Sequence, residues 1–229
     1  MNYIITSNPD AFSHLGNYNY CSLEDMILPE TISVDSETSG ISSLTEDMFC
    51  IQIGTGKNNY LIDFQDYSLP LFNSYISPIT FEDVIPYLKG KTLIFHNCCF
   101  DLKFFYKHNF FPEKVRDTMI ASQVLYNGDA FIYSHSLGAV MERELGIKLE
   151  KDEQSHIHKT RLSTPRNIQY CFDDVNKLGA LEKVLYSKLE AYTAEKAYLF
   201  NCEFTLAQTY LEMCGLPIDA SLWKVKMDK

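Results

Sequence analysis

Side chains that can bind cations or move protons occur at three separated places in this sequence. Asp35 and Glu37 lie two residues apart in TISVDSETSG, and side chains two apart on a strand point to the same face. Two carboxylates this close repel each other, and burying either one is costly unless a positive group neutralises it. The alternative is a turn that merely follows a strand, because Ser39 and Gly40 supply turn residues. The pair indicates a cation site only if other segments contribute partners.

Two later segments carry further acids. FHNCCFDLKFF contains Asn97 and Asp101, where a buried strand is expected to turn into a helix, and α/β folds bind ligands at that edge of the sheet. NIQYCFDDV places Tyr170 and Asp174 four residues apart, hence on one face of a predicted helix. Each segment has a structural alternative, since Asp101 would also suit the first turn of a helix and Asp174 an acidic surface helix.

The elements that must position these residues are a mixture of strands and helices. Apolar or alternating runs predict strands at residues 2–6, 31–36, 48–53, 59–63 and 91–97. The spacing of apolar residues predicts helices at 8–17, 80–89, 100–108, 117–126, 135–145, 164–190 and 195–214. An antiparallel meander followed by a helix, a buried strand and more helices indicates an α/β fold with a mixed sheet.

Composition narrows the class of protein. The chain has 229 residues, of which 46% are hydrophobic, so it forms one good-sized domain or one domain and the start of another. It contains no run of about 18 apolar residues, so no membrane span or membrane partner is expected. A net charge of −10 argues against tight nucleic-acid binding through a broad basic surface. It does not argue against an enzyme that handles phosphates through bound metal ions.

The cysteines indicate the compartment. There are seven, and no CxxC motif occurs, so neither a zinc ribbon nor a redox dithiol is indicated. Scattered thiols in apolar surroundings are typical of a reduced, intracellular protein. A cytoplasmic location is expected, in the host cytoplasm if the protein is viral.

Taken in order, the three segments resemble the three motifs of the DnaQ-like 3′–5′ exonuclease superfamily. Asp-x-Glu, then Asn-x3-Asp, then Tyr-x3-Asp is similar to its DEDDy branch, in which a tyrosine precedes the last aspartate. RDTMIASQVL after the second motif and LSTPRNIQYCFDDV around the third add to the match, which covers roughly residues 1–190. The resemblance implies an RNase H-like fold, with a five-stranded mixed sheet of order 3-2-1-4-5 flanked by helices.

The resemblance also implies roles for the four acids and the tyrosine. Asp35, Glu37, Asp101 and Asp174 would hold two divalent ions, Mg2+ or Mn2+, which prefer hard oxygen ligands. Asp35 would bridge the ions, and Glu37 and Asp174 would help hold the one that generates the nucleophile. Asp101 would act around the second ion, largely through water. Tyr170 would orient the attacking water, with Glu37 as its hydrogen-bonding neighbour.

Other side chains are candidates for binding the substrate. Ile41 lies where related polymerase exonucleases have a leucine that wedges against the terminal base, although packing alone would also explain it. Thr38 and Asn97 would contact the terminal nucleotide or simply cap backbone groups. Arg166 belongs to a basic stretch just ahead of the third motif, for which a solvated loop is the alternative. The other members of that stretch are His156, His158, Lys159 and Arg161.

Two further expectations concern His96 and the C-terminal region. His96 precedes Asn97 on a buried strand and is expected to be a satisfied core histidine. EFTLAQTYLEMCGLPID resembles the segment that joins the exonuclease and polymerase domains of family A DNA polymerases. Residues 1–195 are therefore expected to form the exonuclease domain. Residues 196–229 would form a C-terminal helix and the start of a truncated, polymerase-like segment.

The function expected from this resemblance is metal-dependent removal of 5′-mononucleotides from a single-stranded or frayed DNA 3′ end, in proofreading. A polymerase domain or replication proteins would be its partners. One alternative is an RNA 3′-end-processing exonuclease like RNase D, although the tail does not obviously begin the helical domain usual there. The other is a catalytically inactive nucleic-acid-binding or docking module, against which the presence of all four acids and the tyrosine argues.

Overall fold

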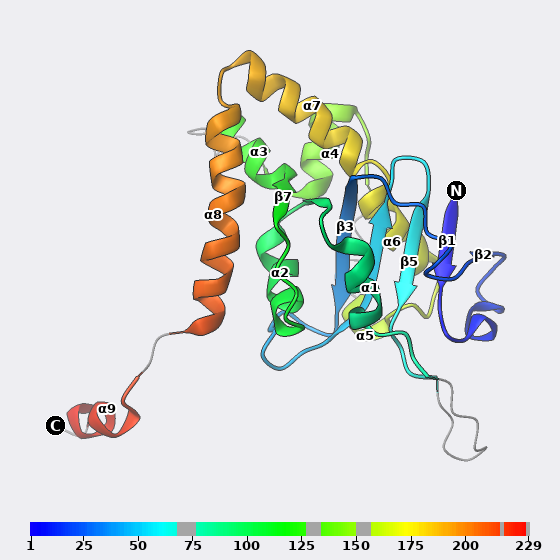
Figure 1. Cartoon of the computed structure of the whole chain (residues 1–229), viewed down its shortest axis with the longest axis horizontal. Helices are drawn as coiled ribbons and strands as arrows, with labels where there is room; N and C mark the ends of the chain where they lie inside the picture. Colours follow the sequence, from blue (N-terminus) through cyan, green and yellow to red (C-terminus); the bar gives the residue numbers. More distant parts are fainter. Residues whose placement is uncertain (68–76, 127–133, 150–156, 216–217, 228–229) are drawn as a thin grey trace.

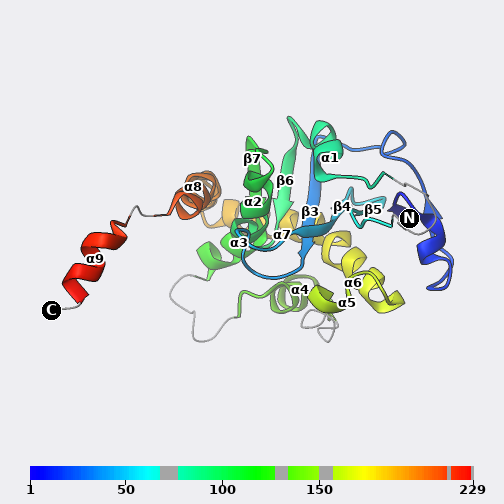
Figure 2. The ribbon, with the colours of Figure 1, turned by 90° about the horizontal axis from the view of Figure 1, so that it is seen from below.

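A mixed β-sheet of seven strands runs through the molecule and carries helices on both faces (Figures 1 and 2). The structure is a computed structural model, and it describes residues 1–67, 77–126, 134–149, 157–215 and 218–227. The strands are β1 (Asn2–Ile5), β2 (Asn19–Tyr20), β3 (Thr31–Thr38), β4 (Met48–Gly54), β5 (Asn59–Asp63), β6 (Thr92–Phe95) and β7 (Lys114–Asp117).

The sheet order is β2-β1-β5-β4-β3-β6-β7. The five strands from β5 to β7 reproduce the expected order 3-2-1-4-5, with β3, β4 and β5 antiparallel and β6 and β7 parallel to β3. The expected number of five strands is wrong, because β1 pairs in parallel with β5 and β2 with β1. Strand β7 was not among the predicted ranges, since its four residues are too few to display a period.

The central strands are buried on both faces, which explains their nearly continuous apolar sequence. Val34 of β3, Ile51 and Ile53 of β4 and Ile62 of β5 have no exposed surface. In Figure 2, α1 and α2 lie on one side of the sheet and α4, α5 and α6 on the other. A strand in this position must therefore present side chains to two different sets of helices.

The helices broadly follow the predicted ranges. They are α1 (Phe81–Leu88), α2 (Cys98–Lys107), α3 (Thr118–Leu125), α4 (Leu137–Leu145), α5 (Ile157–Thr160), α6 (Pro165–Asn176), α7 (Leu178–Ala191), α8 (Glu195–Cys214) and α9 (Ala220–Met227). The single helix predicted at 164–190 is two helices, which meet at Lys177. The helix predicted at 8–17 is only a 3-10 turn, Pro9–Phe12, whose Phe12 is buried.

Helix α8 packs against α2, α3 and β7. The Tyr198 hydroxyl accepts a hydrogen bond of 3.2 Å from the backbone N–H of Asp117, and the Tyr106 hydroxyl donates one of 3.1 Å to the carbonyl of Leu206. These bonds hold the C-terminal end of β7 and helix α2 against α8, a helix that follows the third motif in the sequence. Among the described helices, none combines the length and the apolar character needed to cross a membrane.

Candidate active site

The acidic pair lies on β3, the strand at the centre of the five-stranded part of the sheet. Asp35 and Glu37 point to the face that α6 covers, and the alternation of the strand turns Ser36 between them to the opposite face. Register with β4 shifts between Glu37 and Thr38, so regular pairing ends just beyond the pair. Both carboxylates therefore stand near the end of a strand, where a ligand can approach.

Helix α6 brings the third motif to this pair. Thr164 caps the helix by accepting a hydrogen bond of 3.1 Å from the backbone N–H of Asn167, and Pro165 occupies the first turn. The Asn167 side chain in turn donates to Thr160 and to the carbonyl of Arg161, which fixes the approach to the helix. The start of α6 is thus specified by local contacts.

A glycine lets α6 lie close to the sheet. A Cβ placed on Gly54 of β4 would come within 2.6 Å of the carbonyl oxygen of Val175, the residue after Asp174. No real Cβ tolerates such a contact with backbone, so the absence of a side chain at Gly54 sets the distance between β4 and α6. That distance determines how near Asp174 comes to β3.

Three carboxylates converge at this point. Oxygen atoms of Asp35, Glu37 and Asp174 all lie within 4.8 Å of one another. Asp101 does not belong to this trio, and its Oδ1 instead accepts a hydrogen bond of 2.6 Å from the Ser36 hydroxyl. The structure thus brings three of the four predicted acids into one cluster and holds the fourth beside it, on the side of α2.

The junction between β6 and α2 positions Asp101. Asn97, the residue before the first turn of α2, has φ of 72°, a left-handed conformation that asparagine tolerates better than most residues. The Asp117 carboxylate accepts hydrogen bonds from the backbone N–H groups of Asn97 at 3.1 Å and Cys98 at 2.6 Å. It also accepts from Met119 at 2.7 Å, where it caps α3. One buried carboxylate therefore joins the starts of two helices.

Burial and mutual repulsion hold protons on the cluster. Burial raises the pKa of Asp35 to about 7. Burial also raises the pKa values of Glu37, Asp101 and Asp174, and the charge of Asp35 adds to each of these increases. A cation bound among these oxygens would remove the repulsion. The donor set, three carboxylates within one small space, fits a hard divalent cation such as Mg2+ or Mn2+.

Tyr170 extends the cluster. Burial raises the pKa of its hydroxyl, and the charge of Asp174 adds to that increase, so the phenol stays protonated at neutral pH. The hydroxyl hydrogen-bonds to the Asp174 carboxylate, which lowers the pKa of Asp174. Asp174 lies one turn from Tyr170 on α6, and the charge of Glu37 also acts on the Tyr170 hydroxyl. The predicted hydrogen bond between Tyr170 and Glu37 stays a prediction.

Two cavities meet at the acids. The larger, of about 640 Å³, extends over Glu37, Ile41, Asp101 and His158. The smaller, of about 270 Å³, extends over Met119 and Leu137 toward Asp174. The two share a boundary formed by Asp35, His96, Asn97 and Tyr170. A chain-like substrate can therefore pass over the acids with part of its length on each side.

The chain matches the model of a family described as 3′–5′ exonuclease over residues 19–190. This chain belongs to the 3′–5′ exonuclease family. The resemblance to DnaQ-like exonucleases that the three motifs predicted is thereby confirmed. DNA polymerase I of Aquifex aeolicus is 28% identical over 208 residues, which cover 81% of the chain. The matched part is 32% of the polymerase, so the exonuclease spans about a third of that relative's length.

Solved structures of other proteins share this fold. Brucella melitensis NrnC bound to pGG superposes with a TM-score of 0.70 and 21% identity, over 96% of this exonuclease and 97% of NrnC. Escherichia coli RNase D superposes with a TM-score of 0.68 and 22% identity, over 91% of this exonuclease and 51% of RNase D. At these identities the likeness shows the fold, and the expected RNase H-like exonuclease fold is confirmed.

The remaining predicted side chains differ in whether they line the larger of the two cavities, which is called the exonuclease cavity from here on. Ile41 is 89% exposed and lines it, so packing does not explain this residue. Asn97 and Thr38 also line it. Asn97 is exposed, and the buried Thr38 donates a hydrogen bond of 2.7 Å from its hydroxyl to the carbonyl of Gly40. Arg166 is exposed at the start of α6 and is not part of either cavity wall. Its predicted contact with substrate stays a prediction.

Part of the basic stretch, and also His96, lies at the cavities. His158 of α5 lines the larger cavity, Arg161 stacks on the ring of Phe49, and His156 lies outside the described residues. His96 is not a core residue as expected. It is half-buried, lines both cavities and bonds through Nδ1 to the Thr118 hydroxyl at 2.9 Å.

Phe100 and Ser36 are among the residues of the exonuclease cavity that were not predicted from the sequence. Phe100 lines it one residue before Asp101, and its aromatic type next to the second motif was the available signal. Ser36 also lines it, although strand alternation indicates only that its side chain points away from Asp35. What Ser36 contacts could not be read from local sequence, because its partner is 65 residues away.

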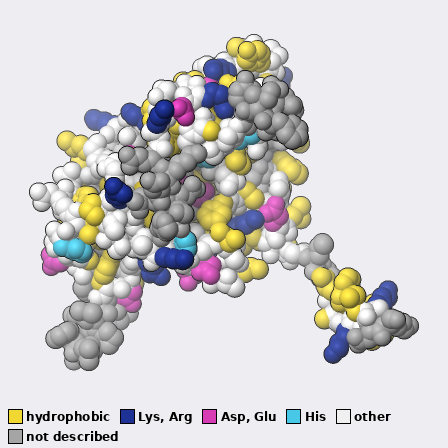
Figure 3. Space-filling model, turned by 180° about the vertical axis from the view of Figure 1, so that it is seen from behind, with side chains coloured by type: hydrophobic (Ala, Val, Ile, Leu, Met, Phe, Trp, Pro, Cys, Tyr) yellow, Lys and Arg dark blue, Asp and Glu magenta, His cyan; other side chains and the backbone are white. Residues whose placement is uncertain are grey.

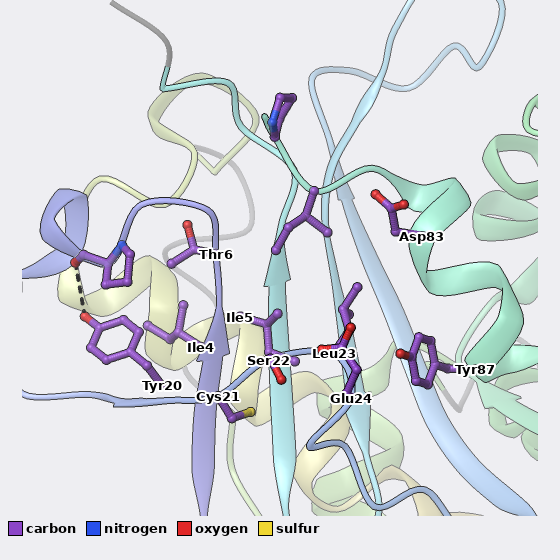
Figure 4. A pocket seen from close by; sticks show the side chains of 13 residues that line it. Ile4, Ile5, Thr6, Tyr20, Cys21, Ser22, Leu23, Glu24, Asp83 and Tyr87 are labelled. Carbon is purple, nitrogen blue, oxygen red and sulfur yellow. Dashed lines mark hydrogen bonds between the residues drawn. The ribbon is translucent and has the colours of Figure 1, made fainter. Parts of the chain in front are cut away.

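The charged side chains on the surface of the exonuclease are scattered on the face seen in Figure 3. On the face seen in Figure 3, the Lys and Arg side chains of the described residues are dispersed among other groups. A separate cavity of about 660 Å³ lies between the β1–β2 region and α1, lined by Tyr20, Glu24, Asp83 and Tyr87 among others (Figure 4). It contains none of the predicted site residues.

Proposed function

We propose that this chain is a metal-dependent 3′–5′ exonuclease that removes 5′-mononucleotides from DNA. The observation that carries this proposal is the cluster of Asp35, Glu37 and Asp174, with oxygens within 4.8 Å of one another, in a chain of the exonuclease family. Tyr170 lies against the cluster and two cavities open beside it. All five residues of the resemblance, Asp101 included, border this one region.

The chain's own residues would divide the work as follows. Asp35, Glu37 and Asp174 would hold divalent cations, Mg2+ or Mn2+, with Asp101 beside Asp35. When bound, two such ions stabilise the attacking and the leaving oxygens of a phosphoryl displacement. The protonated Tyr170 hydroxyl orients the attacking water toward the phosphate. Proximity of these groups in one buried region favours an in-line geometry.

The cavities suggest how a 3′ end binds. The scissile phosphate would lie at the shared boundary of Asp35, Asn97 and Tyr170, with one nucleotide on each side. The exposed Ile41 would contact the terminal base, and the exposed Asn97 amide would contact its nucleotide. His158 and the neighbouring basic residues would contact phosphates. A single-stranded or frayed end fits such a path better than a duplex.

DNA is the favoured substrate because the family relative is a DNA polymerase I. Proofreading, with a polymerase domain or replication proteins as partners, follows from the same relative. Under this proposal residues 1–195 are the exonuclease domain, and residues 196–229 begin a polymerase-like segment. Helix α8 also packs on the exonuclease, so the boundary would be a packed one. The free thiols of all seven cysteines support a reducing, cytoplasmic setting.

RNA is the second candidate substrate. RNase D, an exoribonuclease involved in structured RNA processing, and NrnC bound to pGG share this fold. NrnC moreover matches along nearly its whole length, unlike the polymerase. The groups that distinguish a 2′-hydroxyl would lie in the same cavities, so both substrates have to be compared directly.

The test incubates the protein with matched DNA and RNA single strands, each labelled at the 5′ end, in Mg2+ or Mn2+. Stepwise shortening from the 3′ end with release of 5′-mononucleotides is expected, faster on DNA. Asp35→Ala should abolish it. Faster loss of RNA would replace the DNA assignment with the RNase D-like one. Endonucleolytic cuts, or full activity in Asp35→Ala, would contradict the proposal.

A catalytically inactive binding module is the remaining alternative. It predicts no degradation of either strand and no metal binding by calorimetry. We expect the parent protein to bind Mn2+ and Asp35→Ala to have lost that binding. This result would exclude the inactive module, which has no functional metal site.

A further inference from the structure

Ser36 lies between the two acids of β3 but faces the other side of the sheet. Its side chain is 6% exposed and points toward the side on which Figure 2 shows α2. There its hydroxyl donates a hydrogen bond of 2.6 Å to Oδ1 of Asp101, a residue on the first turn of α2 that is 2% exposed. A bond this short, between buried groups, is of the strong kind formed with carboxylates.

This contact decides where the Asp101 carboxylate stands. Asp101 and Asp35 lie close enough to repel each other when both are ionised, as they would be with cations bound, and this repulsion favours an Asp101 side chain turned away from the cluster. A restraint on Asp101 opposes that rotation. The Ser36 hydroxyl is attached to the same strand as Asp35, one residue on. It therefore ties the carboxylate of α2 to the backbone segment that carries the trio, at the wall of the larger cavity.

We propose that Ser36 is a positioning residue, whose hydroxyl fixes the Asp101 carboxylate beside Asp35 so that a second divalent cation can be held there. The proposal rests on the proposed metal-dependent function and deepens it, because it gives the residue between the two acids of the first motif a role at the second cation. Groups that hydrogen-bond to metal ligands commonly change metal affinity by about 10- to 100-fold when they are removed.

The test measures Mn2+ binding to the metal-free protein by calorimetry, with electron paramagnetic resonance as a second readout. The parent is expected to bind two ions. Ser36→Ala should weaken the weaker of the two sites by about tenfold and leave the tighter one nearly unchanged. Ser36→Thr, which retains the hydroxyl, should restore most of the affinity.

Ser33→Ala is the matched control. Ser33 lies on the same strand and is 3% exposed, but it faces Gly179 of α7 and not Asp101. Removal of the Ser33 hydroxyl should not change the affinity for Mn2+. Thermal unfolding of each variant reports whether it folds, and Ser36→Cys, which is similar in size but a weak donor, replaces Ser36→Ala if that variant does not fold.

A double-mutant cycle separates positioning from a general loss of packing. If Ser36 acts through Asp101, Ser36→Ala should lower neither Mn2+ affinity nor kcat further in an Asp101→Asn background. Additive losses would overturn the proposal, as would Mn2+ binding by Ser36→Ala equal to that of Ser33→Ala. A parent that binds no Mn2+ and degrades no strand would instead contradict the proposed function itself, so the two failures are distinguishable.

Discussion

At the scale of single residues, two acids adjacent in the sequence have very different surroundings. Asp173 and Asp174 are adjacent on α6, yet Asp173 accepts from Gln169 on the exposed side while Asp174 joins the buried cluster. Burial and the charge of Asp35 raise the pKa of Asp174. Such a group is costly for the folded protein, and the cost is understandable if the group serves a cation.

Asp174→Asn is expected to reduce kcat about a thousandfold, or about 4 kcal/mol, because a neutral amide holds a dication poorly. Asp173→Asn should stay within about twofold of the parent, since that carboxylate lies outside the cluster. Single-turnover rates on a labelled DNA strand measure both. Equal effects of the two changes would show that the cluster is not the catalytic centre.

Tyr170→Phe should have a milder effect than loss of an acid. Under the proposed function the phenol would orient water, but it is not one of the clustered carboxylates, so a decrease of about 10- to 100-fold in kcat is expected. Mn2+ affinity should change little. A Tyr170→Phe variant that has lost its metal would mean that the tyrosine is part of the metal-binding set.

At the scale of elements, the site is built by how closely α6 approaches the sheet. Gly54 lies against the carbonyl of Val175, and this contact places Asp174 against β3. A side chain at Gly54 would push the helix and the last carboxylate outward. The position of Asp174, a proposed cation ligand, thus depends on a glycine in a different strand that takes no part in the chemistry itself.

Gly54→Ala is expected to lower stability by about 1–3 kcal/mol and to lower kcat disproportionately, because α6 must move away from β4. Gly179→Ala is the matched control. A Cβ there meets the Ser33 hydroxyl at 3.3 Å, a side chain that can adjust, so its effect should be small. Chemical denaturation and single-turnover assays measure the two quantities. Wild-type activity in Gly54→Ala would contradict this account of the packing.

At the scale of the whole molecule, the acidic cluster makes stability depend on pH and metal. The pKa of Asp35 is about 7 in the folded protein, above the ordinary value of 3.8. The folded state therefore binds a proton that the unfolded chain releases, and this contribution to stability is present at low pH and lost as pH rises from about 4 through 7. Divalent cations should compensate for that loss once the acids are ionised.

Metal-free protein is expected to have a lower Tm at pH 8 than at pH 6, and Asp35→Asn should reduce that difference. Added Mg2+ should raise Tm at pH 8 and have little effect at pH 5, where protons compete for the same oxygens. Differential scanning calorimetry in matched buffers provides the measurement. An identical pH dependence in the parent and Asp35→Asn would show that the cluster does not control stability in this range.

Much of the site was predictable because its parts are local patterns. The alternation of β3 predicts that Asp35 and Glu37 share a face, and the period of α6 predicts the same for Tyr170 and Asp174. The order of the motifs led to the sheet order as well. The wrong predictions concern weak local signals, such as the four residues of β7 and the turn at Pro9–Phe12.

The amino-acid sequence by itself determined which side chains are candidates for the chemistry and which of them are paired within one strand or one helix, because such pairing follows from the geometry of a few neighbouring residues. Only the tertiary structure decided that Asp101 bonds to Ser36 and that β1 and β2 widen the sheet. Most of these contacts join residues far apart in the chain, and which atoms meet there depends on how every intervening element packs.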